Sequence, residues 1–280
     1  MTYCYNGAMN TVAKTSHAPY SSYCTHDIDA GNTAVKVFFK NAHHHVQVQV
    51  FSTPALLENA GPLLDFLRAQ HARRVRWRSS LPPVFQATLK DALEDASHQA
   101  PPWVLESLEK ASLAPALDAW HYNLDELGLD RMLHLVAARQ LVEAAGVVVI
   151  SAGTATTVDF MVERTHFGGW IQGGYGVWQS ALLEKAPHLR PSRNEELFLD
   201  LGHNTATALG YGGQRPYVLG LAHAVREQVL ACFGGEVPMV ILTGGHAPAL
   251  LQAGLGDSLN LPCVQVPDLG AFWSLYQLND

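Results

Sequence analysis

Two segments of the chain repeat one pattern, and this repetition restricts the fold more than any other feature. In DIDAGNTAVK, residues 27–36, a strand pattern meets Gly31, Asn32 and Thr33, and a second strand pattern follows. In VVVISAGTATTVDF, residues 147–160, a buried apolar strand pattern meets Gly153 and Thr154. More strand patterns and then helix patterns follow each segment. The repetition predicts a duplicated α/β domain whose two hairpin turns face each other across a cleft.

The length of 280 residues is sufficient for two packed domains. We predict a loose N-terminal extension over residues 1–25, a first domain over 26–145 and a second over 146–280. Three antiparallel strands are expected at the start of the first domain. The pattern TPALLENAGPLLDFLRAQ indicates a helix disturbed at Gly61-Pro62. A second helix is predicted over ELGLDRMLHLVAARQLVEAAG, with Gly146 as its stop.

The composition excludes some classes of partner. The formal net charge of −7 argues against a general binder of nucleic acid or of anionic membranes, because such partners need a basic face. No apolar run approaches the roughly 20 residues of a membrane span, and the N-terminus lacks the apolar region of a signal peptide. The four cysteines form no CxxC pair. We therefore expect a cytoplasmic protein with reduced thiols.

The first motif, Asp29 to Lys36, has the groups that a phosphate site needs. Gly31 lets the backbone approach a ligand closely, and the N–H groups, Asn32 and Thr33 can donate to phosphate oxygens. Asp29 can hold a hydrated magnesium ion, and Lys36 adds positive charge. The alternative is an ordinary hairpin turn with a surface lysine, which is the favoured interpretation of this motif taken alone.

Two further glycine motifs follow along the chain. Gly153 and Thr154 can cradle phosphate, or they form a small-residue turn in a core hairpin. In LTGGHA, Gly244 and Gly245 can let a flat nucleoside lie against the backbone, or they form a plain strand-to-helix turn. Each motif is weak by itself, and the order of all three in two similar halves is the stronger signal.

The fourth motif is YNLDELGLDR, in which Asp130 stands at a predicted helix start. A carboxylate there is most often a cap or a group that complements the helix dipole. The functional alternative is a general base that accepts the proton of an alcohol as it attacks a γ-phosphate.

Together these motifs resemble the phosphotransferase superfamily of acetate kinase, sugar kinases and actin. LGLDR, GTATTVD and GGWI look specifically like the type III pantothenate kinase family, which includes proteins named Bvg accessory factor. The resemblance runs from about Asp27 to the C-terminus. It implies two similar ribonuclease H-like, actin-like ATPase domains, each with a mixed five-stranded sheet and helices, and an active-site cleft between them.

The resemblance also implies a function: ATP-dependent phosphorylation of pantothenate to 4′-phosphopantothenate, the first step of coenzyme A biosynthesis, by a homodimer that uses Mg²⁺ and K⁺ or NH₄⁺. Asp130 matches the catalytic base, and Arg131 suits the pantothenate carboxylate. Tyr122 is the candidate for a substrate tyrosine, although His121 stands at the family's usual spacing. The full set of implied residues is Asp29, Gly31, Asn32, Thr33, Lys36, Gly153, Thr154, Gly244 and Gly245 for ATP, and Tyr122, Gly128, Leu129, Asp130 and Arg131 for substrate.

The sequence departs from the family pattern at several positions. Ser151 replaces the aspartate that helps to bind the monovalent cation, so this ligand is lost unless a carboxylate such as Asp159 replaces it. Ala186 stands where the family has a substrate threonine, and Gly173 replaces a proline, which predicts a looser loop. Two alternatives therefore stay open: a catalytically impaired homologue that binds nucleotide or pantothenate in a regulatory role, and a same-fold kinase for another small alcohol.

Three other groups are interpreted as structural. His43, His44 and His45 fit a solvated turn, because neighbouring strand side chains point to opposite faces. Tryptophans 77, 103 and 120 are expected in the core or an interface. The basic strand pattern RRVRWR is interpreted as an exposed or dimer-facing surface.

Overall fold

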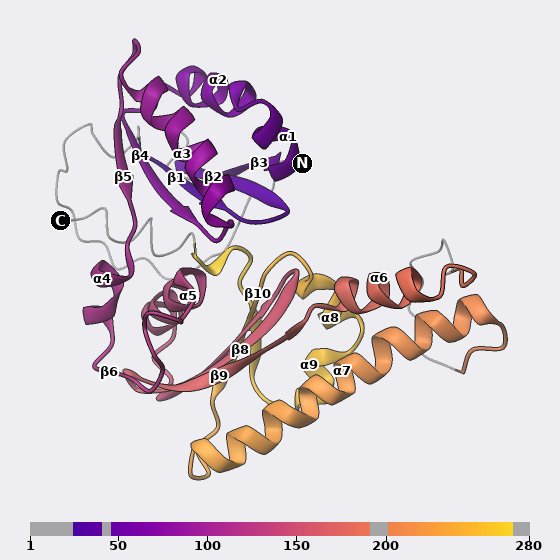
Figure 1. The fold of residues 1–280 in the computed structure, drawn as a ribbon. Coiled ribbons are helices and arrows are strands. Elements are labelled where there is room, and N and C mark those ends of the chain that lie inside the picture. Colours follow the sequence, from indigo (N-terminus) through magenta and orange to yellow (C-terminus); the bar gives the residue numbers. More distant parts are fainter. Residues whose placement is uncertain (1–24, 41–45, 191–200, 271–280) are drawn as a thin grey trace. The chain divides into compact units, whose positions relative to one another are not determined.

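The computed structural model describes residues 25–40, 46–190 and 201–270, and Figure 1 shows its elements. These residues separate into two compact units. The first contains the described residues up to Ser112 together with Gly128–Asp130, and the second contains those of Leu113–Leu127 and Arg131–Gly270. The predicted extension, except Thr25, lies outside the described residues, as do His43–His45. The domain boundary at 145/146 stays a prediction.

The sheet of the first unit has the strand order β3-β2-β1-β4-β5. β1 pairs with β2 and β2 with β3 in antiparallel directions, whereas β4 runs parallel to β1 and β5 parallel to β4. The three antiparallel strands predicted at its start are therefore confirmed. The bounds are β1 (Thr25–Ala30), β2 (Ala34–Lys40), β3 (Val46–Ser52), β4 (Arg74–Ser79) and β5 (Val104–Ser107).

Helices pack on one face of this sheet, where the alternating apolar residues of its strands form a core. The disturbance predicted at Gly61-Pro62 is a break between two helices, and Pro62 stands in the first turn of the second, where no N–H is needed. The helices are α1 (Thr53–Glu58), α2 (Gly61–Ala69) and α3 (Pro83–Ser97). Their buried leucines, including Leu63 and Leu89, join Ile28, Val75 and Trp77 in one cluster.

The sheet of the second unit repeats the first and adds one strand. Its order is β11-β10-β7-β8-β9-β6. Read as β9-β8-β7-β10-β11, five of its strands have the same order and directions as β3-β2-β1-β4-β5 of the first sheet. The predicted duplication is confirmed, but the prediction of five strands in each sheet is wrong for the second. β6 is too short to show strand alternation in the sequence. The bounds are β6 (Ala119–Trp120), β7 (Gly146–Ala152), β8 (Ala155–Val162), β9 (Thr165–Gly173), β10 (Met239–Thr243) and β11 (Cys263–Gln265).

The helix predicted to end at Gly146 ends earlier. α5 spans Leu129–Leu141, and Gly146 is the first residue of β7. A side chain at Gly146 would place its Cβ 2.6 Å from ring carbons of Phe233. This glycine therefore permits close packing and does not terminate the helix. Two short elements precede α5, namely α4 (Lys110–Leu113) and the 3₁₀ helix at Ala114–Ala116.

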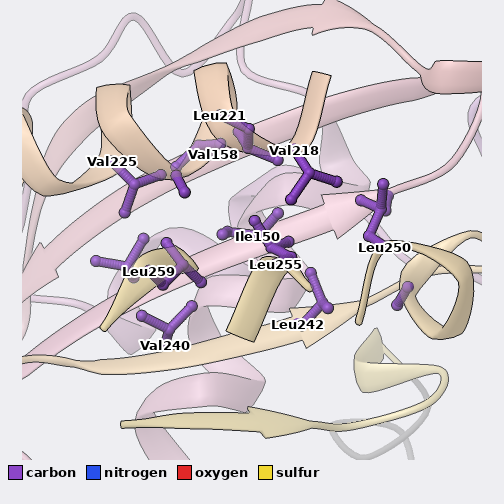
Figure 2. Packing of buried hydrophobic residues seen from close by; sticks show 14 of the residues in the cluster. Ile150, Val158, Val218, Leu221, Val225, Val240, Leu242, Leu250, Leu255 and Leu259 are labelled. Carbon is purple, nitrogen blue, oxygen red and sulfur yellow. The ribbon is translucent and has the colours of Figure 1, made fainter. Parts of the chain in front are cut away.

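The core of the second unit lies between its sheet and the helices α7, α8 and α9. Figure 2 shows Val218, Leu221 and Val225 of the long helix α7 beside Ile150 of β7 and Val158 of β8. Asn204 caps α7 by accepting from the backbone N–H of Thr207 at 3.0 Å. Among the described residues, no helix combines the length and apolar composition that crossing a membrane requires. The bounds are α6 (Tyr175–Lys185), α7 (Thr205–Cys232), α8 (Ala247–Gln252) and α9 (Leu255–Leu259).

Candidate active-site residues

The first predicted phosphate turn is a short connection between β1 and β2. The N–H of Gly31 donates to the carbonyl of Ala34 at 3.0 Å, and Asn32 and Thr33 are exposed. Thr53, which is buried at the start of α1, fixes both ends of the turn. Its hydroxyl donates to the carbonyl of Gly31 at 2.6 Å, and its backbone N–H donates to the carbonyl of Thr33 at 3.2 Å. The two bonds from Thr53 therefore fix the backbone of the turn, while the side chains of Asn32 and Thr33 are exposed.

Asp29, the predicted magnesium ligand, already has a cationic partner. Nη2 of Arg78 lies 2.8 Å from its Oδ2. The described residues contain no group of three or more His, Cys, Asp or Glu side chains that could hold a metal ion. A magnesium ion keeps waters and phosphate ligands, so one carboxylate can suffice, but this carboxylate is engaged. The residues around Asp29 therefore do not fit a protein-held magnesium ion, and its predicted role stays a prediction.

Two of the basic residues of β4, Arg76 and Arg78, are not on the exposed surface that the sequence suggested, whereas Arg74 is exposed. Nε and Nη2 of Arg76 bond to the two carboxylate oxygens of Asp27 at 2.5 and 2.8 Å. The Arg76 side chain is only 18% exposed and that of Arg78 only 9%. Burial raises the pKa of Asp27, and the charge and hydrogen bonds of Arg76 oppose that shift. Arg76 and Arg78 thus pair with acids of β1, because the parallel register sets them opposite Asp27 and Asp29.

The second predicted phosphate turn joins β7 to β8. The N–H of Gly153 donates to the carbonyl of Ala155 at 2.9 Å, and Thr154 is exposed. The loop after β9 packs tightly against it, since a Cβ at Gly174 would lie 2.2 Å from the carbonyl oxygen of Gly153. Gly173, which was expected to loosen this loop, accepts a bond at 3.2 Å from the hydroxyl of Tyr217.

The predicted nucleoside turn is tied directly to the second phosphate turn. Gly244 has a φ of +94°, and a Cβ there would lie 2.3 Å from the carbonyl oxygen of Ala152. The next-but-one residue, His246, donates its backbone N–H to the same carbonyl at 3.0 Å. Nδ1 of its ring lies 3.1 Å from the carbonyl oxygen of Gly153. Because a carbonyl only accepts, this contact requires the proton on Nδ1. Gly245 has open space around it.

Ser151, the position of the family's cation-binding aspartate, stands opposite Thr157 in the β7–β8 pair. Asp159, the carboxylate considered as its replacement, stands opposite Val149 and is fully engaged elsewhere. Ser151 offers a neutral hydroxyl where the family has a carboxylate, so this position lacks the charged ligand for a monovalent cation. Ala186 is the residue that follows the last turn of α6.

Asp130 lies in the first turn of α5, as predicted, and is half-buried. Gly128 immediately precedes the helix and Leu129 begins it. An acid in this position complements the positive end of the helix dipole. Its role as catalytic base stays a prediction.

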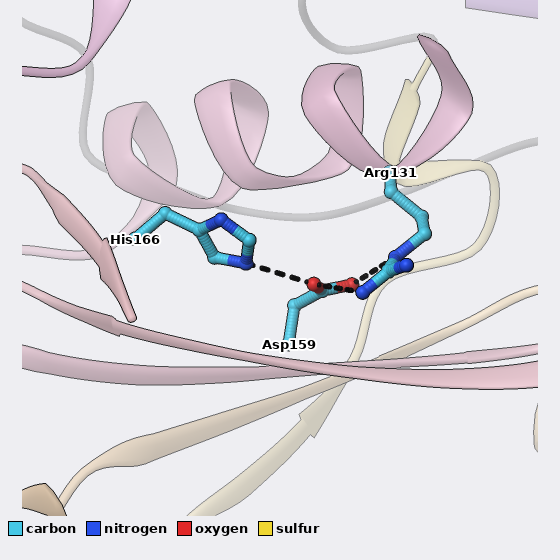
Figure 3. Close-up of polar contacts among 3 residues, drawn as sticks. All are labelled: Arg131, Asp159 and His166. Atoms are coloured by element: carbon cyan, nitrogen blue, oxygen red, sulfur yellow. Dashed lines mark hydrogen bonds and ion pairs between the residues drawn. The ribbon is translucent and has the colours of Figure 1, made fainter. Parts of the chain in front are cut away.

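Arg131, one residue further on, enters a buried polar network that Figure 3 shows. Its Nε and Nη2 bond to Oδ2 and Oδ1 of Asp159 at 2.9 and 2.6 Å, and Nε2 of His166 lies 2.9 Å from the same Oδ1. All three side chains are less than 5% exposed. Burial alone lowers the pKa of Arg131, but the hydrogen bonds and charge of Asp159 raise it, so the guanidinium stays charged. Nδ1 of His166 is buried and has no hydrogen-bond partner among the described residues.

Tyr122, and not His121, joins this network. The guanidinium carbon of Arg131 lies 5.0 Å from the centre of the Tyr122 ring, which stacks on His166 at 6.1 Å. The ring of His121 instead contacts Phe167 at 5.1 Å. β6 runs parallel to β9 with Trp120 opposite His166, and Tyr122 follows two residues later. The unpredicted sixth strand therefore brings the tyrosine to Arg131.

Four residues of these sites were missed by sequence reasoning, because their roles come from contacts with distant parts of the chain, and Asp159 was considered only as a replacement cation ligand. Gly169 is the clearest sequence signal among them, since its glycine pair was noted without a role. A Cβ at this position would lie 2.7 Å from Oδ1 of Asp159 and 3.0 Å from Nη2 of Arg131. The four are Thr53, His166, Gly169 and His246. Of the tryptophans expected inside, Trp77 and Trp103 are buried and Trp120 is half-buried.

Solved structures with a similar backbone confirm the predicted fold class. A candidate 2-dehydro-3-deoxygalactonokinase from Sinorhizobium meliloti has a TM-score of 0.55 and 12% identity, covering 90% of this chain and 97% of the other. A conserved candidate Baf family transcriptional activator from Campylobacter jejuni has a TM-score of 0.50 and 17% identity, with coverage of 90% and 96%. At these identities the likeness shows the fold alone.

Sequence relatives give the family. The chain is 25% identical over 219 residues to the type III pantothenate kinase of Pseudoalteromonas atlantica, covering 78% of this chain and 85% of the relative. It is 29% identical over 228 residues to that of Marinomonas sp., covering 80% and 84%. The family model of type III pantothenate kinase matches residues 27–230, which include both hairpin turns and LGLDR. The chain therefore belongs to the type III pantothenate kinase family.

Proposed function

We propose that this protein phosphorylates pantothenate with ATP to give 4′-phosphopantothenate, the first step of coenzyme A biosynthesis. The observation that carries the proposal is the match of the family model over residues 27–230. Retention of the two hairpin turns and of an acid in the first turn of α5 supports it.

In this reaction Asp130 accepts the proton of the pantothenate hydroxyl as the hydroxyl oxygen attacks the γ-phosphorus of ATP. The bond between the γ-phosphorus and the bridging oxygen breaks, ADP leaves, and the phosphate ester remains. The backbone N–H groups and side chains at Asn32, Thr33, Gly153 and Thr154 orient the phosphates. Positioning and charge neutralisation provide most of the rate enhancement in such reactions.

In the proposed pantothenate site, the guanidinium of Arg131 packs on the Tyr122 ring, and the Tyr122 ring stacks on His166. A guanidinium has five N–H donors, and two of those of Arg131 bond to Asp159. The proposal assigns the remaining donors to the substrate carboxylate, which requires the 4% exposed side chain of Arg131 to become accessible when substrate binds. Gly128 and Leu129, at the helix start, complete the proposed pantothenate segment.

The proposal includes finer features that follow from the family alone. These are magnesium entering as the ATP complex, activation by K⁺ or NH₄⁺, a homodimeric assembly and a cytoplasmic location. When bound, magnesium neutralises charge on the phosphates. The weak ligand set at Ser151 predicts that activation by the monovalent cation is small.

The test is ATP-dependent phosphorylation of pantothenate by the purified full chain, with and without K⁺ or NH₄⁺. Asp130→Asn is expected to lower kcat by at least about a hundredfold. The matched control is Asp91→Asn on α3, where the side chain is exposed and no change is expected. Absence of turnover with ATP still bound would favour a binding homologue, and an unchanged rate in Asp130→Asn would reject the base assignment.

A further inference from the structure

The first phosphate turn follows a carboxylate that stands between two cationic residues. Asp29 is the parallel partner of Arg78 on β4 and the antiparallel partner of Lys36 on β2. Residues directly opposite on neighbouring strands point to the same face of a sheet. Lys36, Asp29 and Arg78 therefore form one row across three strands, with a net charge of +1 before any metal ion arrives.

Burial makes Arg78 difficult to displace from this row. Its side chain is 9% exposed, compared with 29% for Asp29. Nη1 of Arg78 is buried and has no hydrogen-bond acceptor among the described residues. The bond from Nη2 to Asp29 therefore offsets the burial of the positive charge of this guanidinium. A buried charge that loses its partner is strongly unfavourable. The carboxylate of Asp29 is therefore needed where it is.

A second cation at Asp29 would also be repelled. A divalent ion bound at the exposed edge of this carboxylate would lie within several ångströms of a guanidinium in a partly buried site, where like charges interact more strongly than in water. The neighbouring pair, Arg76 and Asp27, repeats the same compensation two residues earlier but lies further from the turn. On this face of the first sheet, Arg76 and Arg78 each neutralise an acid of β1.

We propose that Arg78 takes the place of a protein-held divalent cation at Asp29. The first turn then meets the phosphates of a nucleoside triphosphate with Arg78 and Lys36 as resident positive charges, and Asp29 contributes nothing to magnesium affinity. This inference rests on the proposed function only in requiring that nucleotide binds at the turn. It does not require phosphoryl transfer.

The experiment measures the dissociation constant of ATP by calorimetry in EDTA and in excess Mg²⁺, and compares the ratio of the two constants between proteins. Wild type and Asp29→Asn are expected to give the same ratio within about twofold. Arg78→Met frees Asp29, so its magnesium dependence is expected to become at least about tenfold steeper. Arg78→Lys, which keeps the charge, and Arg76→Met, the matched control on the same face, are expected to keep the wild-type ratio.

Two results would overturn the inference. The first is a large ratio in wild type that Asp29→Asn abolishes, because Asp29 would then be the magnesium ligand. The second is an absence of ATP binding by wild type in both buffers. The comparison of wild type with Asp29→Asn remains informative even if Arg78→Met does not fold. Failure of the proposed function has a different signature, since pantothenate would not be phosphorylated while the magnesium ratios stayed measurable.

Discussion

Replacement of Asp159 by asparagine tests whether the network around Arg131 is a buried charge pair. The substitution keeps the size of the side chain but removes its negative charge, and leaves the guanidinium charged and enclosed. Arg131 and Asp159 have side chains that are 4% and 3% exposed and are joined by two hydrogen bonds. Removing one partner of such a pair costs about 3–5 kcal/mol. We expect Asp159→Asn to lower the free energy of unfolding by an amount in this range.

The assay is urea unfolding followed by tryptophan fluorescence, with hydrogen exchange of α5 and β8 to assign the loss to the second unit. Trp120 is a suitable reporter because its ring lies 5.6 Å from that of His166. The control is Asp118→Asn, which breaks a pair with Arg164 at a similar distance of 2.9 Å but with side chains 69% and 48% exposed. Exposed pairs contribute about 0–1 kcal/mol, so little change is expected.

The double variant Arg131→Met/Asp159→Leu separates charge burial from loss of shape. Because it removes both charges, it is expected to recover at least about half of the stability lost in Asp159→Asn. A loss below about 1 kcal/mol in Asp159→Asn would refute the reasoning, since it would mean that the guanidinium is solvated or compensated elsewhere. In Asp159→Asn we also expect the KM for pantothenate to rise more than the KM for ATP.

Three further predictions concern the glycines, the first turn and a thiol. Gly169→Ala places a Cβ 2.1 Å from a backbone carbonyl oxygen, whereas the Cβ of Gly245→Ala meets nothing within 4 Å. Urea unfolding should show that Gly169→Ala lowers the free energy of unfolding by about 1–3 kcal/mol. A comparable loss in Gly245→Ala would contradict this steric argument. Thr53→Val removes the 2.6 Å hydrogen bond to the carbonyl of Gly31. It is expected to lower the free energy of unfolding by about 1 kcal/mol and to raise the KM for ATP, and Thr53→Ser is expected to restore both. An unchanged KM would show that nucleotide binding does not depend on this bond. Burial raises the pKa of Cys263, so less thiolate is present in the folded than in the unfolded protein as pH rises through the thiol range; iodoacetamide labelling near pH 8 should be slower in the folded state, and equal rates would speak against it.

Much of the fold could be predicted because its signals are local. Strand patterns on either side of the Gly-Asn-Thr turn predicted β1 and β2, and period-two alternation predicted β3. Glycine followed by Asn-Thr or Thr identified the two turns, and the apolar face after Asp130 identified α5. The errors occurred where a local signal was absent or ambiguous. β6 has two residues and exists only as a partner of β9, and Gly146 looked like a helix stop but serves the packing of Phe233.

The sequence by itself determined the duplicated α/β organisation, the two turns and the position of Asp130 at a helix start, because backbone preference and hydrophobic periodicity act over a few neighbouring residues. Only the tertiary structure decided which charged side chains meet. Asp29 and Arg78 are 49 residues apart, Arg131 and Asp159 are 28 apart, and His246 and the carbonyl of Gly153 are 93 apart. Strand register and helix packing bring these groups together. The sequence does not show which charges pair, because a charged group requires a specific partner only when the fold buries it.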